Sequence, residues 1–112
     1  MIQKLLLVLI MISTLTGCSN LTGEKEFRES LSKVEEPLHA GNWDEGKKHA
    51  NELLDMYKTN KWRLQMIGAE DEYEQLHESI NRLRTAIDEK NLLQAKLEMA
   101  TIYGIFEEMY SI

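Results

Sequence analysis

The strongest constraint on the fold of this chain is a series of apolar residues spaced alternately four and three positions apart. Residues with this spacing share one face of an α-helix and form a continuous seam that must pack against other helices. The seam therefore predicts one long helix in the second half of the chain. Its members are Trp62, Met66, Ala69, Tyr73, Leu76, Ile80, Leu83 and Ile87.

One glycine, Gly68, lies inside the seam. A glycine in a helix interior costs about 1 kcal/mol relative to alanine. Because the apolar spacing does not change at Gly68, we predict a continuous helix that follows a polar turn at residues 58–61. The alternative is that the preceding helix runs on to Ile67 and that the chain turns at Gly68.

Three other segments also show helical spacing of apolar residues. The first begins at Phe27 and is stopped by Gly41, the second starts at Trp43, and the last follows Asn91. The last has the widest apolar face, so we expect it to be the most buried. With only 6 glycines and 1 proline in 112 residues, the chain has too few turns for an all-β fold. The sequence predicts an all-α fold.

The chain also contains an internal repeat, which appears when it is shifted by 49 positions. The stripe that begins at Phe27 then falls on the one that begins at Leu76, and Asn42 falls on Asn91. Each Asn is followed three positions later by Glu or Gln, as in a helix-capping box. We therefore predict two αα-hairpins of similar design that pack as an antiparallel four-helix bundle.

The first seventeen residues have the features of a secretory signal. A positive charge at Lys4 is followed by an unbroken apolar run at residues 5–12 and then by smaller residues. That run is shorter than the about 20 residues that a membrane-spanning helix needs. The segment ends in a sequence that resembles the lipobox of bacterial lipoproteins and contains the only cysteine of the chain, namely Leu15, Thr16, Gly17 and Cys18.

The resemblance to lipoproteins implies cleavage before Cys18 and attachment of two acyl chains to the protein, palmitate among them. Residues 1–17 are then the signal peptide, 18–23 a short tether and 24–112 the helical domain. Because two acyl chains hold a protein stably at a bilayer, we expect the domain at the extracytoplasmic face of the cell membrane. The net charge of -6 argues against nucleic acid as a partner, since phosphates require a basic face.

Two Glu-x-x-His pairs, Glu36 with His39 and Glu74 with His77, raise the alternative of a metal site. In ferritin-like proteins, two such pairs and two further Glu point into a four-helix bundle and bind two metals. Here both pairs lie beside the apolar seams, where side chains are solvated. We therefore predict no metal and no cofactor, and a metal-binding or small-ligand-binding bundle is the alternative function.

The candidate interface residues are Trp43, Trp62, Glu107 and Glu108. Trp is favoured as an anchor at protein interfaces, although core packing also explains a Trp at a helix start. Glu107 and Glu108 lie in the last turn of the last helix, where acidic residues oppose the helix dipole and indicate a basic partner.

No motif in the sequence supports an enzyme. There is no Ser-His-Asp order, no glycine-rich phosphate loop and no pair of carboxylates on an apolar face. A hydrolase acting on the cell envelope is therefore the weakest of three hypotheses. We expect an interaction or adaptor module, bound to the membrane by its lipid, whose partner is another envelope protein or a second copy of itself.

The whole pattern is similar to that of small Gram-positive envelope proteins with the domain of unknown function forty-three sixty-three. Trp43, Trp62, the acidic and aromatic residues from Glu70 to Tyr73 and the turn from Asn91 to Leu97 carry the resemblance, which covers residues 27–110. That family has no assigned activity. The resemblance implies a helical fold and a place in the envelope, and no function.

The phase of the long seam can be tested by comparing Ile80, on the seam, with Glu74 and His77 beside it. Ile80→Ala should lower the unfolding free energy by about 2–5 kcal/mol, as for other buried aliphatic residues. Glu74→Ala and His77→Ala should change it by less than about 0.5 kcal/mol. Urea unfolding of the three variants measures the difference. If either polar variant were as damaging as Ile80→Ala, the Glu-x-x-His pair would face inward.

Overall fold

The computed structural model describes residues 2–4, 23–68 and 70–111, and every regular element within these ranges is a helix. The all-α prediction is therefore confirmed for this part of the chain. Cys18 and most of the predicted signal and tether lie outside it. After the short helical segment at residues 2–4, the helices are α2 (Glu24–His39), α3 (Trp43–Thr59), α4 (Lys61–Ile67), α5 (Glu70–Asp88) and α6 (Leu92–Met109).

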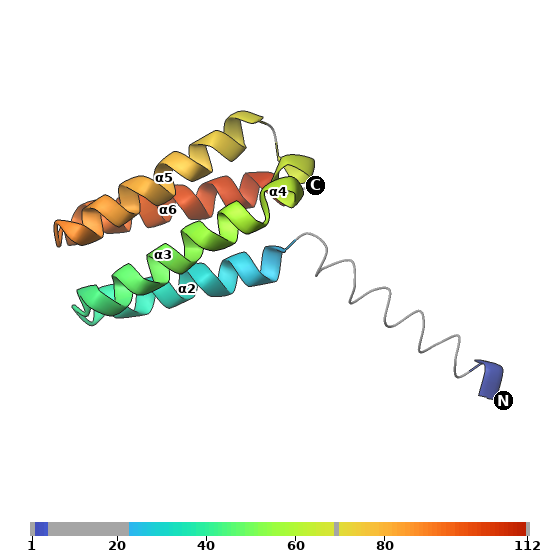
Figure 1. The fold of residues 1–112 in the computed structure, drawn as a ribbon, viewed down its shortest axis with the longest axis horizontal. Helices are drawn as coiled ribbons and strands as arrows, with labels where there is room; N and C mark the ends of the chain where they lie inside the picture. Colours follow the sequence, from blue (N-terminus) through green and yellow to red (C-terminus); the bar gives the residue numbers. More distant parts are fainter. Residues whose placement is uncertain (1, 5–22, 69, 112) are drawn as a thin grey trace.

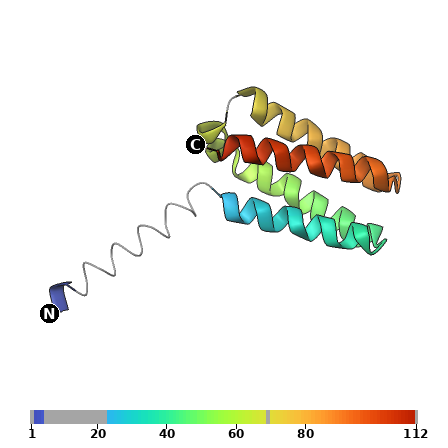
Figure 2. The same cartoon turned by 180° about the vertical axis from the view of Figure 1, so that it is seen from behind.

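Each long helix packs most extensively against the long helix next to it in the sequence. α2 packs against α3 and α5 packs against α6, while α3 also packs along α5 and α2 touches α6 (Figures 1 and 2). The short helix α4 lies beside the C-terminal end of α6, at the end of the molecule where α2 begins. This arrangement places the turns at residues 40–42 and 89–91 together at the opposite end.

These two turns have the same construction. Gly41 and Lys90 both have positive φ angles, of 73° and 56°. The N–H groups of Asn42 and Asn91 donate to the carbonyl five residues earlier, at 2.8 and 2.9 Å. Each Asn side chain then caps the next helix by accepting from the N–H three residues later. The hydrogen bonds of the two turns therefore correspond under the 49-residue repeat. Lys90 takes the place of Gly41 and has a left-handed conformation that glycine adopts more readily.

The core is built on the part of the seam that lies in α5. Leu76, Ile80 and Leu83 are completely buried, as predicted. Phe27 of α2 and Phe106 of α6 meet in the same core, with ring centroids 5.1 Å apart. The apolar faces of the four long helices thus share one hydrophobic cluster, which is what the heptad spacing requires.

The prediction of one continuous helix from Trp62 to Ile87 is wrong. The chain leaves the helix at Gly68, which has extended backbone angles (φ -117°, ψ 158°), and α4 ends at Ile67. The result is close to the alternative, in which the preceding helix continues to Ile67, except that α3 and α4 are separated at Asn60. Ala69, another predicted seam residue, lies outside the described residues.

Because the helix breaks, the first part of the predicted seam is not buried. Trp62 and Met66 are 52% and 73% exposed, and Leu64 is the residue that α4 buries. Gly68 also makes a close tertiary contact, since a Cβ atom on it would lie only 2.7 Å from the end of the Met109 side chain. The sequence spacing could not reveal this contact because Met109 comes from the far end of the chain.

As expected, α6 is the helix with the largest share of buried residues, seven of 18 against seven of 19 in α5, but its wide apolar face is not buried as a whole. Its buried face carries Ala95, Met99, Ile102 and Phe106, but Leu93 and Leu97 are 70% and 54% exposed. The wide apolar surface of α6 therefore consists of two faces, one in the core and one in contact with solvent.

Two glycine substitutions distinguish the observed break from a continuous helix. Gly68→Ala should lower the unfolding free energy by about 1–3 kcal/mol because Met109 is buried and the added methyl overpacks the site. Gly104→Ala, in the exposed interior of α6 with no atom within 4 Å of the new Cβ, should raise it by up to about 1 kcal/mol. Chemical denaturation gives both values. A stabilising Gly68→Ala would support the continuous helix instead.

Candidate interaction surfaces

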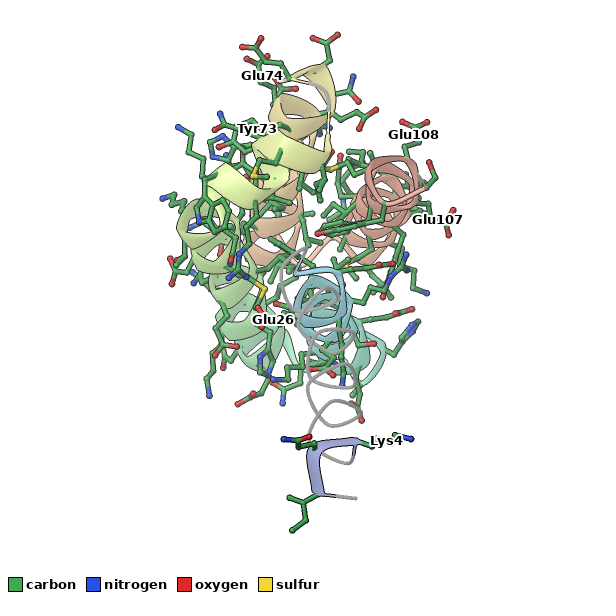
Figure 3. All side chains as sticks on the ribbon, turned by 90° about the vertical axis from the view of Figure 1, so that its right-hand side faces the viewer. Lys4, Glu26, Tyr73, Glu74, Glu107 and Glu108 are labelled. Carbon is green, nitrogen blue, oxygen red and sulfur yellow. The ribbon has the colours of Figure 1, made fainter. Side chains whose placement is uncertain are left out.

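The four predicted interface residues do not form one patch. Trp43 begins α3 at the end of the molecule opposite α4 and is partly buried against the core. Trp62 lies on α4, where its exposed ring carries the Arg63 guanidinium 5.2 Å from its centroid. Glu107 and Glu108 are exposed on α6 and point away from α5 (Figure 3). The structure therefore separates Trp43 from the others.

The two Glu-x-x-His pairs are also separate from each other. Glu36 and His39 are exposed at the end of α2, where the His39 imidazole lies 3.7 Å from the Glu35 carboxylate. His77 of α5 stacks on another helix, with its ring centroid 5.0 Å from that of Tyr57. In the part of the chain that the structure describes, no group of three His, Cys, Asp or Glu side chains could bind a metal.

A surface hollow of about 420 Å³ lies where α3 and α4 meet α5. Tyr57 and Tyr73 both line it; the Tyr57 hydroxyl donates to the Tyr73 carbonyl at 3.2 Å, and the two rings stack. Burial raises the pKa of Tyr57 above its ordinary value. The hollow is lined by both basic and acidic side chains, so it presents no net charge of one sign to a ligand; its residues are Tyr57, Lys58, Lys61, Tyr73, Glu74, His77 and Glu78.

A buried polar cluster between α5 and α6 was missed by the sequence analysis. The Glu98 side chain is almost completely buried, and its Oε1 accepts from Arg82 Nε at 2.9 Å and from Gln94 Nε2 at 3.0 Å. Arg82 also donates to the buried Ser79 hydroxyl. Within the described residues, Glu98 Oε2 has no partner. The sequence signal for this cluster was Glu98, a charged residue on the apolar face of α6 next to Met99. A buried carboxylate requires a paired cation, which here is Arg82.

The exposed apolar residues of α6 form a regular stripe, which we call the α6 outer stripe. It consists of Leu93, Leu97, Ala100 and Gly104, whose steps of 4, 3 and 4 keep them on one face of the helix. All four are exposed, on the side of α6 opposite its core residues. The sequence predicted this region as part of the buried face, because periodicity alone cannot tell a core face from an exposed one.

The tyrosines predict a loss of stability at high pH. Burial, reinforced by the Glu24 carboxylate, raises the pKa of Tyr110 to about 12, whereas an unfolded tyrosine titrates near about 10. Between these values the unfolded chain releases protons that the folded chain keeps, so the unfolding free energy falls as pH rises.

The melting temperature should therefore be unaffected by tyrosine below about pH 9 and should fall from about pH 10 to 12. Tyr110→Phe should fall less steeply over this range. Thermal unfolding followed by circular dichroism at each pH measures the effect. An equal slope in the variant and the parent would show that Tyr110 titrates normally.

The last features to consider are the membrane-crossing capacity of the described helices and the similarity of the chain to known proteins. None of its helices combines the length and apolar character that crossing a membrane requires. Comparison with curated proteins and with solved structures gave no match. A family model described as "Domain of unknown function (DUF4363)" matches residues 21–111. Because this match covers most of the chain and agrees with the sequence resemblance, the protein belongs to the DUF4363 family.

Proposed function

We propose that this protein is a lipid-anchored helical interaction module at the outer face of the bacterial cytoplasmic membrane, without catalytic activity. Its domain is an antiparallel four-helix bundle made of two αα-hairpins. The observation that carries the interaction role is the α6 outer stripe, which exposes Leu93 and Leu97 beside a well-filled core. Exposed apolar surface of this kind marks protein interaction sites.

The lipid anchor is supported by the sequence before α2. The only cysteine, Cys18, follows Leu15-Thr16-Gly17 after an apolar run. The five residues after it span at most about 17 Å when extended, so the anchor keeps the domain close to the bilayer. α2 begins beside α4, where Arg63 approaches Gly23, and the domain therefore meets the membrane with its α4 end.

The hollows give less support to a small ligand. The 420 Å³ hollow is lined by Tyr57 and Tyr73, and Tyr57 already uses its hydroxyl within the fold. Lys58 and Lys61 oppose Glu74 and Glu78 around its rim, which gives no single charge for recognition. An interaction through a helix face instead uses the α6 outer stripe, whose exposed side chains are not buried within the domain.

The anchor is tested with the full chain in a Gram-positive host supplied with labelled palmitate. The parent should incorporate label and fractionate with membranes. Cys18→Ala should lose the label and accumulate as the uncleaved precursor, because the acylated sulfur and the cleavage site are both removed. Ser19→Ala is the matched control and should behave like the parent. Unchanged incorporation of palmitate in Cys18→Ala would contradict the anchor.

A further inference from the structure

We propose that the α6 outer stripe binds the same stripe of a second copy of this chain, with the two α6 helices antiparallel. This inference rests on the proposed interaction role and names its partner, but it does not depend on the lipid anchor. It follows from three observations: the apolar stripe has no role in the fold, its large and small residues are complementary, and its flanking charges are complementary only in the antiparallel direction.

The internal repeat provides the first observation. Within the described chain, α3 and α6 occupy corresponding places in the two hairpins and share their core pattern and their caps. Under the 49-residue shift, the α6 outer stripe corresponds to four polar residues of α3, namely Asp44, Lys48, Asn51 and Asp55. Three of these, Asp44, Lys48 and Asp55, are exposed, whereas Asn51 accepts from Arg84 Nε of α5 at 2.8 Å. The fold therefore tolerates exposed polar side chains at the places of Leu93, Leu97 and Gly104, and the residues of α6 there need a reason outside the domain.

Gly104 is a second case of a residue in the α6 outer stripe that the fold of the domain does not require. It lies in the exposed interior of α6, and a Cβ atom built there meets nothing within 4 Å. A helix-interior glycine costs stability, and no contact within the domain requires one here. A glycine at this place allows a second helix to approach closely.

An antiparallel pair makes the stripe complementary to itself. If Leu97 lies opposite Ala100 of the second copy, Leu93 lies opposite Gly104 of the second copy, because the offsets are equal along both helices. Each large side chain then meets a small residue, as in knobs-into-holes packing. Such a two-fold contact is closed, so it produces a dimer and no fibre.

The charges at the ends of the stripe select this direction. Lys90 precedes α6, and Glu107 and Glu108 end it; within the described residues none of the three forms an ion pair. Inside one copy Lys90 and Glu107 are about 25 Å apart along the helix. The antiparallel pair brings Lys90 of each copy to Glu107 of the other and Glu89 to Glu108, so an end without net charge meets the acidic end. A parallel pair places the two acidic ends together with no cation between them.

The contact is small, and this determines how it must be tested. Residues 93–104 extend over about 17 Å of helix, so the buried area falls below the about 1,200 Å² of a standard stable interface. We therefore expect weak association in dilute solution and efficient association where copies are concentrated, as on a membrane.

The test is disulfide cross-linking of the full chain in membranes of the expressing host. Leu97 lies next to the two-fold axis, so Leu97→Cys should form a covalent dimer under mild oxidation. Leu93→Cys should not, because the two copies of this residue are about 16 Å apart, but it should cross-link to Gly104→Cys when the two are co-expressed. Lys48→Cys, the corresponding place in α3, is the matched control, and the unsubstituted chain gives the background from Cys18.

The expected result is at least about tenfold more dimer from Leu97→Cys than from Lys48→Cys, since a disulfide requires Cα atoms within about 7 Å. Lys90→Glu should reduce the dimer, and the addition of Glu107→Lys and Glu108→Lys should restore it. All substituted residues are exposed, and circular dichroism of each variant confirms that it is folded.

Three results would overturn the proposal. Equal dimer from Leu93→Cys and Leu97→Cys would indicate a parallel pair, a conjugate of another mass would indicate a different protein partner, and the background level of dimer would leave the stripe without this role. Fractionation of the same cells tests the anchor separately. If the chain were absent from membranes, the same cross-links measured with the purified full chain at high concentration would still decide the pairing.

Discussion

Burial of the seam on α5 is the interaction on which the rest of the structure depends. α5 packs on α6, its partner in one helix pair, and on α3, which belongs to the other pair. Leu76, Ile80 and Leu83 have no exposed surface, and burial of one such side chain contributes about 1.5–3 kcal/mol. Loss of this seam would leave each pair with one unpacked apolar face. The rotation of α5 about its own axis therefore determines which faces of α3 and α6 pack inward and which remain exposed.

The 49-residue repeat shows which surface residues of one helix pair differ from those of the other and so are not explained by the shared fold. Both pairs use an asparagine cap after a left-handed residue, so their second helices begin in the same way. The inner positions of α3 and α6 remain apolar, and their outer positions differ, with Lys48 in α3 where α6 has Leu97. α3 packs on both α2 and α5, whereas α6 packs mainly on α5. The positions of Lys48 and Leu97 are nevertheless exposed in both helices, so packing within the domain does not account for this difference. We attribute it to contact with a second copy, and the lipid anchor would raise the local concentration that such a small contact needs.

The departures from regular heptad packing have local physical causes. α4 ends after two turns at Gly68, which has an extended backbone and lies against the Met109 side chain. The short helix then buries Leu64 and turns Trp62 outward. Between α5 and α6, Arg82 compensates the buried charge of Glu98. Glu98 is buried while Arg82 is about half exposed, at 51%, so removal of Arg82 would leave a buried carboxylate without its cation. This ion pair joins α5 to α6.

The sequence by itself determined the helical class, the two asparagine caps, the repeat and the burial of the α5 seam, as well as membership in a family without an assigned activity. These features follow from local spacing and local hydrogen bonds, which a linear pattern records. It also identified Trp62, Glu107 and Glu108 as surface candidates, although it did not place them. Only the tertiary structure decided that the helix breaks at Gly68, that Glu98 is buried and that Leu93 and Leu97 are exposed. Each of these depends on contacts between residues distant in the chain, and apolar periodicity gives the faces of a helix without saying which face the core will cover.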